Sequence, residues 1–298
     1  MLSIGFDIGG TTVKAGAVDE QFRIVRKLSC PTPFGEAEAL ADMLRGMAEE
    51  LAPEGCAAAG VTVPGSIDCE GGIIDAWNIG LHNVPLKKMM EERLGVGVAV
   101  RNDADAAAAA ELKLGALKGV RTGLMLTLGT GVGGSIILNG ELFRGGLGRG
   151  TELGHAVMER GGLKCGCGHR GCIETLCSAS ALTRKAEAAS KEEGMIRVRA
   201  EAGEKPDAKL LIECAREGDA AAIALFDEYT DALADAAASF VNVLDPEVIV
   251  FGGGVSGAGE LLVDALRKKI PPRTFFGSCG RITTASAGND AGILGSLI

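Results

Sequence analysis

Four residues with soft ligand atoms lie close together in the middle of the chain. One residue separates Cys165 from Cys167, four separate Cys167 from Cys172, and His155 precedes the group by ten positions. Three thiolates and one imidazole are a typical ligand set for tetrahedral zinc. His169, inside the loop, is the alternative fourth ligand. The spacing differs from that of a zinc finger, so we expect a structural zinc that stiffens a segment with little periodicity.

Glycine-rich turns occur three times along the chain. The first, Gly5–Gly10, approaches the P-loop spacing but has Thr11 where that loop needs lysine, and no helix follows. The second, Gly129–Gly134, matches GxGxxG but continues into a strand-like run rather than the helix of a dinucleotide fold. The third is Gly252–Gly254. We expect hairpins whose N–H groups and threonine hydroxyls wrap a phosphate chain. If the first or the second turn stood alone, an ordinary β-hairpin would be the simpler interpretation.

Two charged residues flank the first glycine turn. Asp7 lies just before its Gly9-Gly10 pair and is well placed to hold a magnesium ion through water. Lys14 follows it and is within reach of a phosphate. The alternative is a surface aspartate on a plain hairpin, and the recurrence of glycine clusters makes that interpretation less attractive.

The pair Asn102-Asp103 follows a strand-like run and begins an alanine-rich helix. Ligand sites in open α/β sheets commonly lie at the carboxyl ends of strands. An aspartate there can accept the proton of a hydroxyl whose oxygen attacks a γ-phosphate. Helix capping is the alternative role, since Asn and Asp are both good N-caps. For an isolated pair capping is the better interpretation, but the surrounding motifs favour the catalytic one.

Glu152 and Glu174 bracket the cysteine loop. Carboxylates beside a rigid loop can accept hydrogen bonds from sugar hydroxyls, and His155 could offer its second ring nitrogen to the same ligand. For each residue alone, solvent exposure is the simpler interpretation. Together with Asn102 and Asp103 they form a polar set that suits a carbohydrate.

The elements that must position these groups alternate between strands and helices. Strands are predicted at 2–7, 13–18, 22–29, 57–63, 97–101, 123–128, 132–138, 247–251 and 281–285. Helices are predicted at 36–51, 86–94, 103–116, 178–189, 207–216, 219–243, 259–269 and 290–298. The segments FDIGGTTVKAGAVD and LTLGTGVGGSIILN both predict strand, glycine turn and strand. This echo indicates two lobes with similar cores, unless two glycine-rich hairpins are alike by chance.

Composition excludes several classes of function. The formal charge is −9 with no basic block, which argues against a nucleic-acid surface. No apolar run is long enough for a membrane span, and the start has no signal-peptide pattern. Nine cysteines without an export signal favour metal binding over disulfides, and a cytoplasmic location is expected.

These motifs resemble those of the ROK family of sugar kinases, within the superfamily of hexokinase, actin and the heat-shock ATPases. DIGGTTVKAG is similar to its first phosphate motif, LGTGVGGSII to its second and VFGGGVS to its adenosine motif. ELGH followed by CGCGHRGCIE resembles the ROK signature and zinc site. The resemblance runs from about Ser3 to the C-terminus.

The resemblance implies an α/β fold with two ribonuclease-H-like lobes, as in actin-like ATPases, flanking an active-site cleft. The small lobe would comprise 1–117, closed by the C-terminal helix 286–298. The large lobe, 118–285, would carry the zinc loop and the adenosine motif. A homodimer is implied as well.

The resemblance also assigns residues. The catalytic base would be Asp103, and the sugar ligands would be Gly65, Asn102, Asp103, Glu152, His155 and Glu174. ATP would be bound by Asp7, Gly9, Gly10, Thr11, Thr12, Lys14, Gly129, Thr130, Gly131, Gly133, Gly253 and Gly254. Zinc would be held by His155, Cys165, Cys167 and Cys172.

The activity implied is transfer of the γ-phosphate of ATP-Mg²⁺ to the 6-hydroxyl of an aldohexose, with glucose as the leading substrate because ELGH with an intact zinc loop resembles the glucokinase branch. N-acetylglucosamine, N-acetylmannosamine, allose and fructose are alternatives that no single residue separates.

The family's repressors carry a helix-turn-helix ahead of the first phosphate motif, and few residues precede it here. A non-catalytic sugar sensor would need neither Asp7 nor Asp103, and a strand after GTGVGG argues against a nicotinamide-dependent oxidoreductase.

Overall fold

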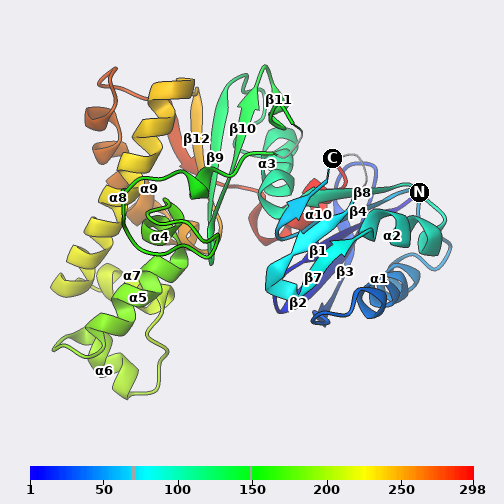
Figure 1. Cartoon of the computed structure of the whole chain (residues 1–298), viewed down its shortest axis with the longest axis horizontal. Coiled ribbons are helices and arrows are strands. Elements are labelled where there is room, and N and C mark those ends of the chain that lie inside the picture. The colour runs from blue at the N-terminus through cyan, green and yellow to red at the C-terminus, as the bar shows by residue number, and fades with distance from the viewer. Residues whose placement is uncertain (69–71, 148–149) are drawn as a thin grey trace. The chain divides into compact units, whose positions relative to one another are not determined.

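Two five-stranded sheets organise the chain, and each has its own hydrophobic core (Figure 1). The computed structural model describes residues 1–68, 72–147 and 150–298. One compact unit comprises 1–118, 142–150 and 286–298, and the other 119–141 and 151–285. They are called unit 1 and unit 2.

The sheet of unit 1 has the order β3-β2-β1-β4-β8. Its strands are β1 (Ser3–Ile8), β2 (Thr12–Val18), β3 (Ile24–Pro31), β4 (Ala59–Val63) and β8 (Val98–Asn102). The predicted hairpin is the antiparallel pair β1–β2, and β1, β4 and β8 run parallel. The carboxyl ends of β1, β4 and β8 therefore share one edge of the sheet.

Four helices complete unit 1, namely α1 (Ala37–Leu51), α2 (Leu86–Leu94), α3 (Asp103–Leu114) and α10 (Ala291–Ser296). Strand glycines let α10 pack closely on the sheet. A Cβ built on Gly5 would lie 2.2 Å from the carbonyl oxygen of Ile293, and one on Gly60 would lie 2.1 Å from that of Ser296. Any larger residue at these positions would push α10 away from β1 and β4.

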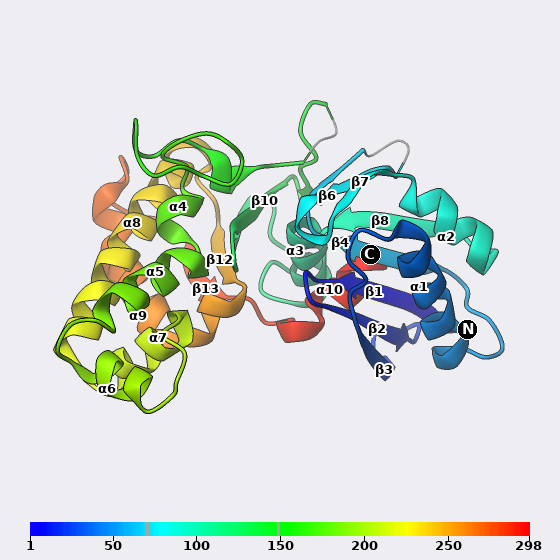
Figure 2. The same cartoon turned by 60° about the horizontal axis from the view of Figure 1, so that its bottom comes forward.

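A small sheet in unit 1 was not predicted. Strands β5 (Ser66–Ile67), β6 (Ile74–Ala76) and β7 (Leu81–Val84) have the order β5-β6-β7, and the 3₁₀ turn η1 (Trp77–Ile79) connects β6 to β7 (Figure 2). Such strands are too short for their alternation to stand out in the sequence.

The sheet of unit 2 has the order β11-β10-β9-β12-β13, the same pattern of a hairpin extended by two parallel strands. Its strands are β9 (Gly123–Leu128), β10 (Val132–Leu138), β11 (Glu141–Leu142), β12 (Val248–Gly252) and β13 (Arg281–Thr284). The echo between the two predicted hairpins is therefore present as corresponding strand pairs.

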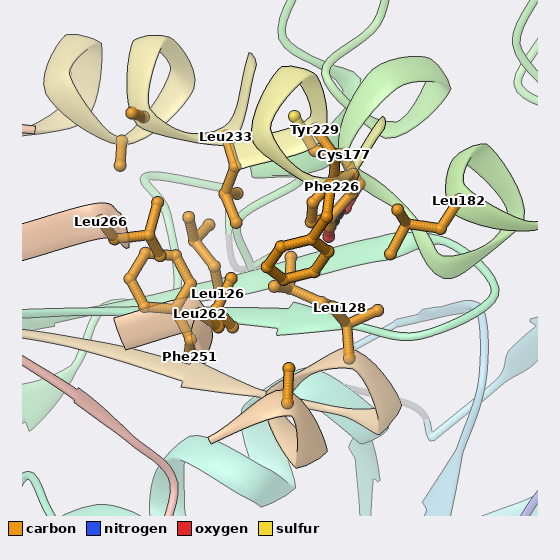
Figure 3. Close-up of a cluster of buried hydrophobic side chains, with 14 of the residues drawn as sticks. Leu126, Leu128, Cys177, Leu182, Phe226, Tyr229, Leu233, Phe251, Leu262 and Leu266 are labelled. Carbon is orange, nitrogen blue, oxygen red and sulfur yellow. Dashed lines mark hydrogen bonds between the residues drawn. The ribbon is translucent and has the colours of Figure 1, made fainter. Parts of the chain in front are cut away.

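The helices of unit 2 are α4 (Glu174–Cys177), α5 (Ala179–Ala189), α6 (Met195–Glu201), α7 (Ala208–Arg216), α8 (Ala220–Leu244) and α9 (Glu260–Lys269). Phe226 and Leu233 point from α8 toward the strand-borne Leu126 and Leu128 (Figure 3). The hydroxyl of the buried Tyr229 donates to the carbonyl of Cys177 at 2.7 Å, so its burial leaves no unpaired polar atom. Helix α6 was not predicted, because its seven residues bury Ile196 alone.

Within the described ranges, no helix is both long and apolar enough to span a membrane.

Candidate active site and metal centre

The turn between β1 and β2 is the first predicted phosphate loop, and hydrogen bonds fix its shape. The amide of Gly9 donates to the carbonyl of Thr12 at 3.0 Å. Thr32 binds the turn twice, because its amide donates to the carbonyl of Thr11 at 3.1 Å and its hydroxyl to that of Gly9 at 2.8 Å. Gly10 and Thr11 are exposed at the tip, where their N–H groups can meet a ligand. Thr32 was missed from the sequence, since it lies after β3 and outside any glycine motif.

Asp7 lies at the end of β1, opposite Lys14 of β2 in the strand pairing. Its carboxyl group packs against Gly292 of α10, where a Cβ would come within 2.5 Å of its Cγ. Burial raises the pKa of Asp7, while the charge of Lys14 opposes the shift and that of Asp290 adds to it. A partly desolvated carboxylate at this edge of the sheet would gain from a bound cation.

The Asn102-Asp103 pair begins α3 as predicted, and the two side chains have different surroundings. Asn102 caps the helix, because its Oδ1 accepts from the amide of Ala104 at 2.8 Å. Its Nδ2 donates to the carbonyl of Gly65 at 2.8 Å, which joins the ends of β4 and β8. Asp103 Oδ1 also accepts from Ala104 at 2.8 Å, and the residue is exposed. Capping is therefore present at Asn102, and the carboxylate of Asp103 is exposed beside it.

Gly65 has φ 109°, and a Cβ there would lie 2.2 Å from the carbonyl oxygen of Asp75. Only glycine fits this conformation and this contact. One edge of the parallel strands therefore holds Asp7 near the end of β1, Gly65 after β4, and Asn102-Asp103 at the end of β8.

The β9–β10 turn of unit 2 is the second predicted phosphate loop. Glu174 lies directly under it, because its Oε2 accepts from the amide of Val132 at 3.1 Å and a Cβ on Gly131 would come 2.3 Å from that oxygen. The hydroxyl of Ser180 donates to the carbonyl of Thr130 at 2.7 Å. The glutamate and the start of α5 therefore hold this turn in place.

The third glycine cluster lies beside the second loop. Gly253 has φ 78°, and a Cβ there would be 2.6 Å from the carbonyl oxygen of Leu128, the residue before Gly129. Gly254 begins the 3₁₀ turn η3 (Gly254–Ala258) directly after it. Gly133 belongs to β10, opposite Thr127. The glycine motifs predicted to bind nucleotide in unit 2 are thus neighbours in space.

The ligand atoms of His155, Cys165, Cys167 and Cys172 all lie within 4.8 Å of one another, the geometry of a candidate metal centre. The Sγ atoms of Cys167 and Cys172 are 3.7 Å apart, and Cys165 Sγ is 3.6 Å from His155 Nδ1. Zinc–sulfur bonds of about 2.3 Å place two tetrahedral sulfur ligands roughly 3.8 Å apart, so the donor set fits zinc in number, type and spacing. His169 Nδ1 lies 3.5 Å from Cys167 Sγ but belongs to no metal-sized group among the described residues. All eight cysteines that the structure describes are free.

The thiols of this group differ in acidity. Burial raises the pKa of Cys165 to about 12. Burial also acts on Cys167, but hydrogen bonds from His169 and the neighbouring thiols outweigh it and lower its pKa to about 6. Cys165 Sγ is also 3.2 Å from Glu174 Oε1, so one carboxylate contacts both the cysteine loop and the glycine turn.

Glu152 and His155 lie at the two ends of the 3₁₀ turn η2 (Leu153–His155). The turn packs on β10, since a Cβ on Gly154 would overlap the carbonyl oxygen of Val132. The hydroxyl of Thr151, just before the turn, donates to the carbonyl oxygen of Gly134 at 2.7 Å. Glu152 is exposed, and His155 is partly so. The glutamates therefore differ, with Glu174 held under a turn and Glu152 at the surface.

Comparison with known proteins shows the family of the chain. Residues 3–298 match the ROK family, and the chain belongs to that family. It is 38% identical to the glucokinase of Thermotoga maritima over 98% of this chain and 95% of that protein. It is 30% identical to the N-acetyl-D-glucosamine kinase of Vibrio atlanticus over 98% of this chain and 97% of that one. Among solved structures, a ROK family glucokinase from Streptomyces griseus in complex with glucose and AMPPNP is 33% identical, has a TM-score of 0.86 and matches 99% of this chain and 98% of its own.

Proposed function

We propose that the chain is an ATP-dependent sugar kinase that phosphorylates glucose. Similarity to glucokinases carries this assignment, because it extends over 98% of the chain in sequence and over 99% of it in structure rather than over an isolated segment. ATP is the proposed donor, since the Streptomyces griseus relative was solved with an ATP analogue.

The proposed mechanism has Asp103 as its general base. Asp103 accepts the proton of the 6-hydroxyl as that oxygen attacks the γ-phosphate, and Asn102 and Gly65 hold the sugar beside it. Exposure of Asp103 at the first turn of α3 supports this role, because a base must reach the substrate hydroxyl. Glu152, His155 and Glu174 are proposed as further sugar ligands.

The phosphates are proposed to contact the first turn, from Gly9 to Thr12, and Lys14 of unit 1. In unit 2 the proposed contacts are Gly129, Thr130, Gly131, Gly133, Gly253 and Gly254. Mg²⁺, when bound near Asp7 through water, would neutralise part of the triphosphate charge. Zn²⁺ would be held by His155, Cys165, Cys167 and Cys172 and would stabilise the cysteine loop.

At the level of domains, we propose that 1–117 with 286–298 forms the small ribonuclease-H-like lobe and 118–285 the large one. A homodimer is proposed from the family resemblance, to be tested by analytical ultracentrifugation. The cytoplasm is the proposed location, since it supplies ATP.

An N-acetylhexosamine kinase is the second candidate, favoured by the Vibrio atlanticus relative. A hexose panel separates the candidates: ADP production is measured with ATP, Mg²⁺ and either glucose, N-acetylglucosamine, N-acetylmannosamine, allose or fructose. We expect the highest kcat/KM with glucose. Preference for an acetylated sugar would replace glucose as the substrate, and ADP production independent of every sugar would reject the kinase assignment. Binding of glucose without turnover would identify a sensor instead.

A further inference from the structure

Trp77 is the single tryptophan of the chain, and 74% of it is exposed. It is the first residue of η1, between the buried Ala76 and the exposed Asn78. Exposure of so large an apolar ring to water is unfavourable in free energy. An exposed tryptophan beside ligand-binding groups is therefore a candidate for contact with the ligand.

The residue before Trp77 contacts the proposed sugar loop. Gly65 packs so closely on this strand that a Cβ there would lie 3.0 Å from the Cα of Ala76. The carbonyl of Gly65 accepts the hydrogen bond of Asn102, the neighbour of Asp103. Trp77 is therefore one residue away from the backbone that positions the proposed sugar ligands of unit 1.

The residue after Trp77 faces the proposed phosphate loop. Asn78 Nδ2 lies 3.8 Å from where a Cβ on Gly10 would be, and the carbonyl of Ile79 accepts from the amide of Gly35, three residues after Thr32. In the proposed reaction the 6-hydroxyl of the sugar meets the γ-phosphate of ATP. The sugar therefore has to lie where the segment around Gly65 and the turn around Gly10 are neighbours. Trp77 lies between Ala76 and Asn78, the two residues that approach these loops.

His82 of β7 supports the indole ring. The two ring centroids are 3.9 Å apart with an interplanar angle of 51°, so the ring is held from one side. The high exposure of Trp77 leaves the remainder of the ring open to a ligand. An exposed aromatic face beside a second ring is suited to stacking on a ligand.

We infer that Trp77 is a specificity-determining residue, whose ring packs against the apolar C–H face of the hexose. The inference rests on the proposed function and adds a basis for substrate choice. In glucopyranose all ring hydroxyls can be equatorial, which leaves axial C–H groups to contact an aromatic face. Allose has an axial 3-hydroxyl, which would leave water without gaining a partner on the indole.

Intrinsic fluorescence gives a direct test, because every tryptophan signal of this chain comes from Trp77. Titration with glucose in the absence of ATP should change the emission saturably, with a midpoint equal to the dissociation constant from calorimetry. Allose should give a weaker change at higher concentration. Calorimetric binding of glucose with no change in emission would overturn the inference.

Variants test the same idea through kinetics. Trp77→Ala should raise the KM for glucose about tenfold, the scale of one aromatic contact, and lower the glucose-to-allose ratio of kcat/KM. Trp77→Phe should retain most of the preference. Phe275→Ala is the matched control, since it removes an aromatic side chain that is 89% exposed in unit 2.

Different results would reject the role of Trp77 and the kinase assignment. An active wild-type glucose kinase whose Trp77→Ala variant keeps the same KM and the same ratio would reject the role of Trp77 and leave the kinase assignment intact. A wild-type chain without sugar-dependent ADP production would reject the proposed function itself. Equal melting temperatures of wild type and Trp77→Ala verify that the variant is folded.

Discussion

At the scale of single residues, two aspartates at one sheet edge have opposite environments. Asp7 is largely buried under α10, while Asp103 is exposed at the start of α3. The proposed roles match these environments: the buried Asp7 would bind a metal ion through water, and the exposed Asp103 would accept a proton. A buried carboxylate benefits from a cation, and a base must be reachable by its substrate.

Asp103→Asn should lower kcat by about a thousandfold, because the amide cannot accept the hydroxyl proton. Sugar affinity, measured by calorimetry, should change little, since Asn102 and the Gly65 loop remain. Asp105→Asn, in the same first turn, is the control and should stay active. Full turnover in the Asp103 variant would refute the base assignment.

Asp7→Asn should abolish phosphorylation and yet stabilise the ligand-free protein at neutral pH. Burial raises the folded pKa of Asp7, so ionisation costs more in the folded than in the unfolded state. The gain should be complete above the folded pKa and shrink as the pH falls toward the unfolded value. Thermal melts across pH measure it, and a variant less stable than wild type at pH 7 would contradict the burial argument.

At the scale of elements, Glu111 of α3 fixes two segments of unit 1. Its carboxylate is fully buried and accepts from the amides of Ala116, Ser286 and Ala287 at 2.6, 2.7 and 2.6 Å, and from the Ser286 hydroxyl at 3.0 Å. It therefore ties the end of the helix that carries Asp103 to the segment leading into α10. The sequence did not reveal this, because a glutamate in an alanine-rich helix looks like a solvent-facing residue.

Glu111→Ala should destabilise the protein by about 3 kcal/mol, since several buried donors would lose their acceptor. Chemical denaturation measures the change. Lys118→Ala, at an exposed position nearby, should be nearly neutral. Equal stability of the two variants would show that the buried carboxylate contributes nothing.

The cysteine loop is the second element with a testable role. About one zinc per chain should co-purify, and replacing Cys165, Cys167 and Cys172 together by serine should remove it and lower the melting temperature. Cys30→Ser, outside the cluster, is the control and should keep the metal. Full metal content in the triple variant, measured by atomic emission, would refute the assignment.

At the scale of the whole molecule, the sequence predicted most of the parallel strands and long helices, because hairpin glycines and apolar periodicity extend over many residues. It missed the three short strands around Trp77 and the helix α6, whose few residues carry no clear period. Thr32 and Glu111 were missed for another reason. Their roles depend on residues distant in sequence, and a single sequence does not show which partners fold onto them.

The site was predictable to a similar extent. The Asn102-Asp103 pair follows a strand end that the pattern located, whereas Gly65 came only from the family resemblance. The parallel pairing of β1, β4 and β8 brings these residues to one sheet edge, and the structure alone shows it. The position of Glu174 under the Gly131 turn was not predictable, because it arises from side-chain packing between distant segments.

The most direct test of the whole account is identification of the reaction product. Purified protein, glucose, ATP and Mg²⁺ are incubated together, and the sugar is examined by proton and phosphorus NMR. We expect glucose 6-phosphate formed in equal amount with ADP, and none in the Asp103→Asn variant. Phosphate on another hydroxyl, or ADP released without any phosphorylated sugar, would contradict it.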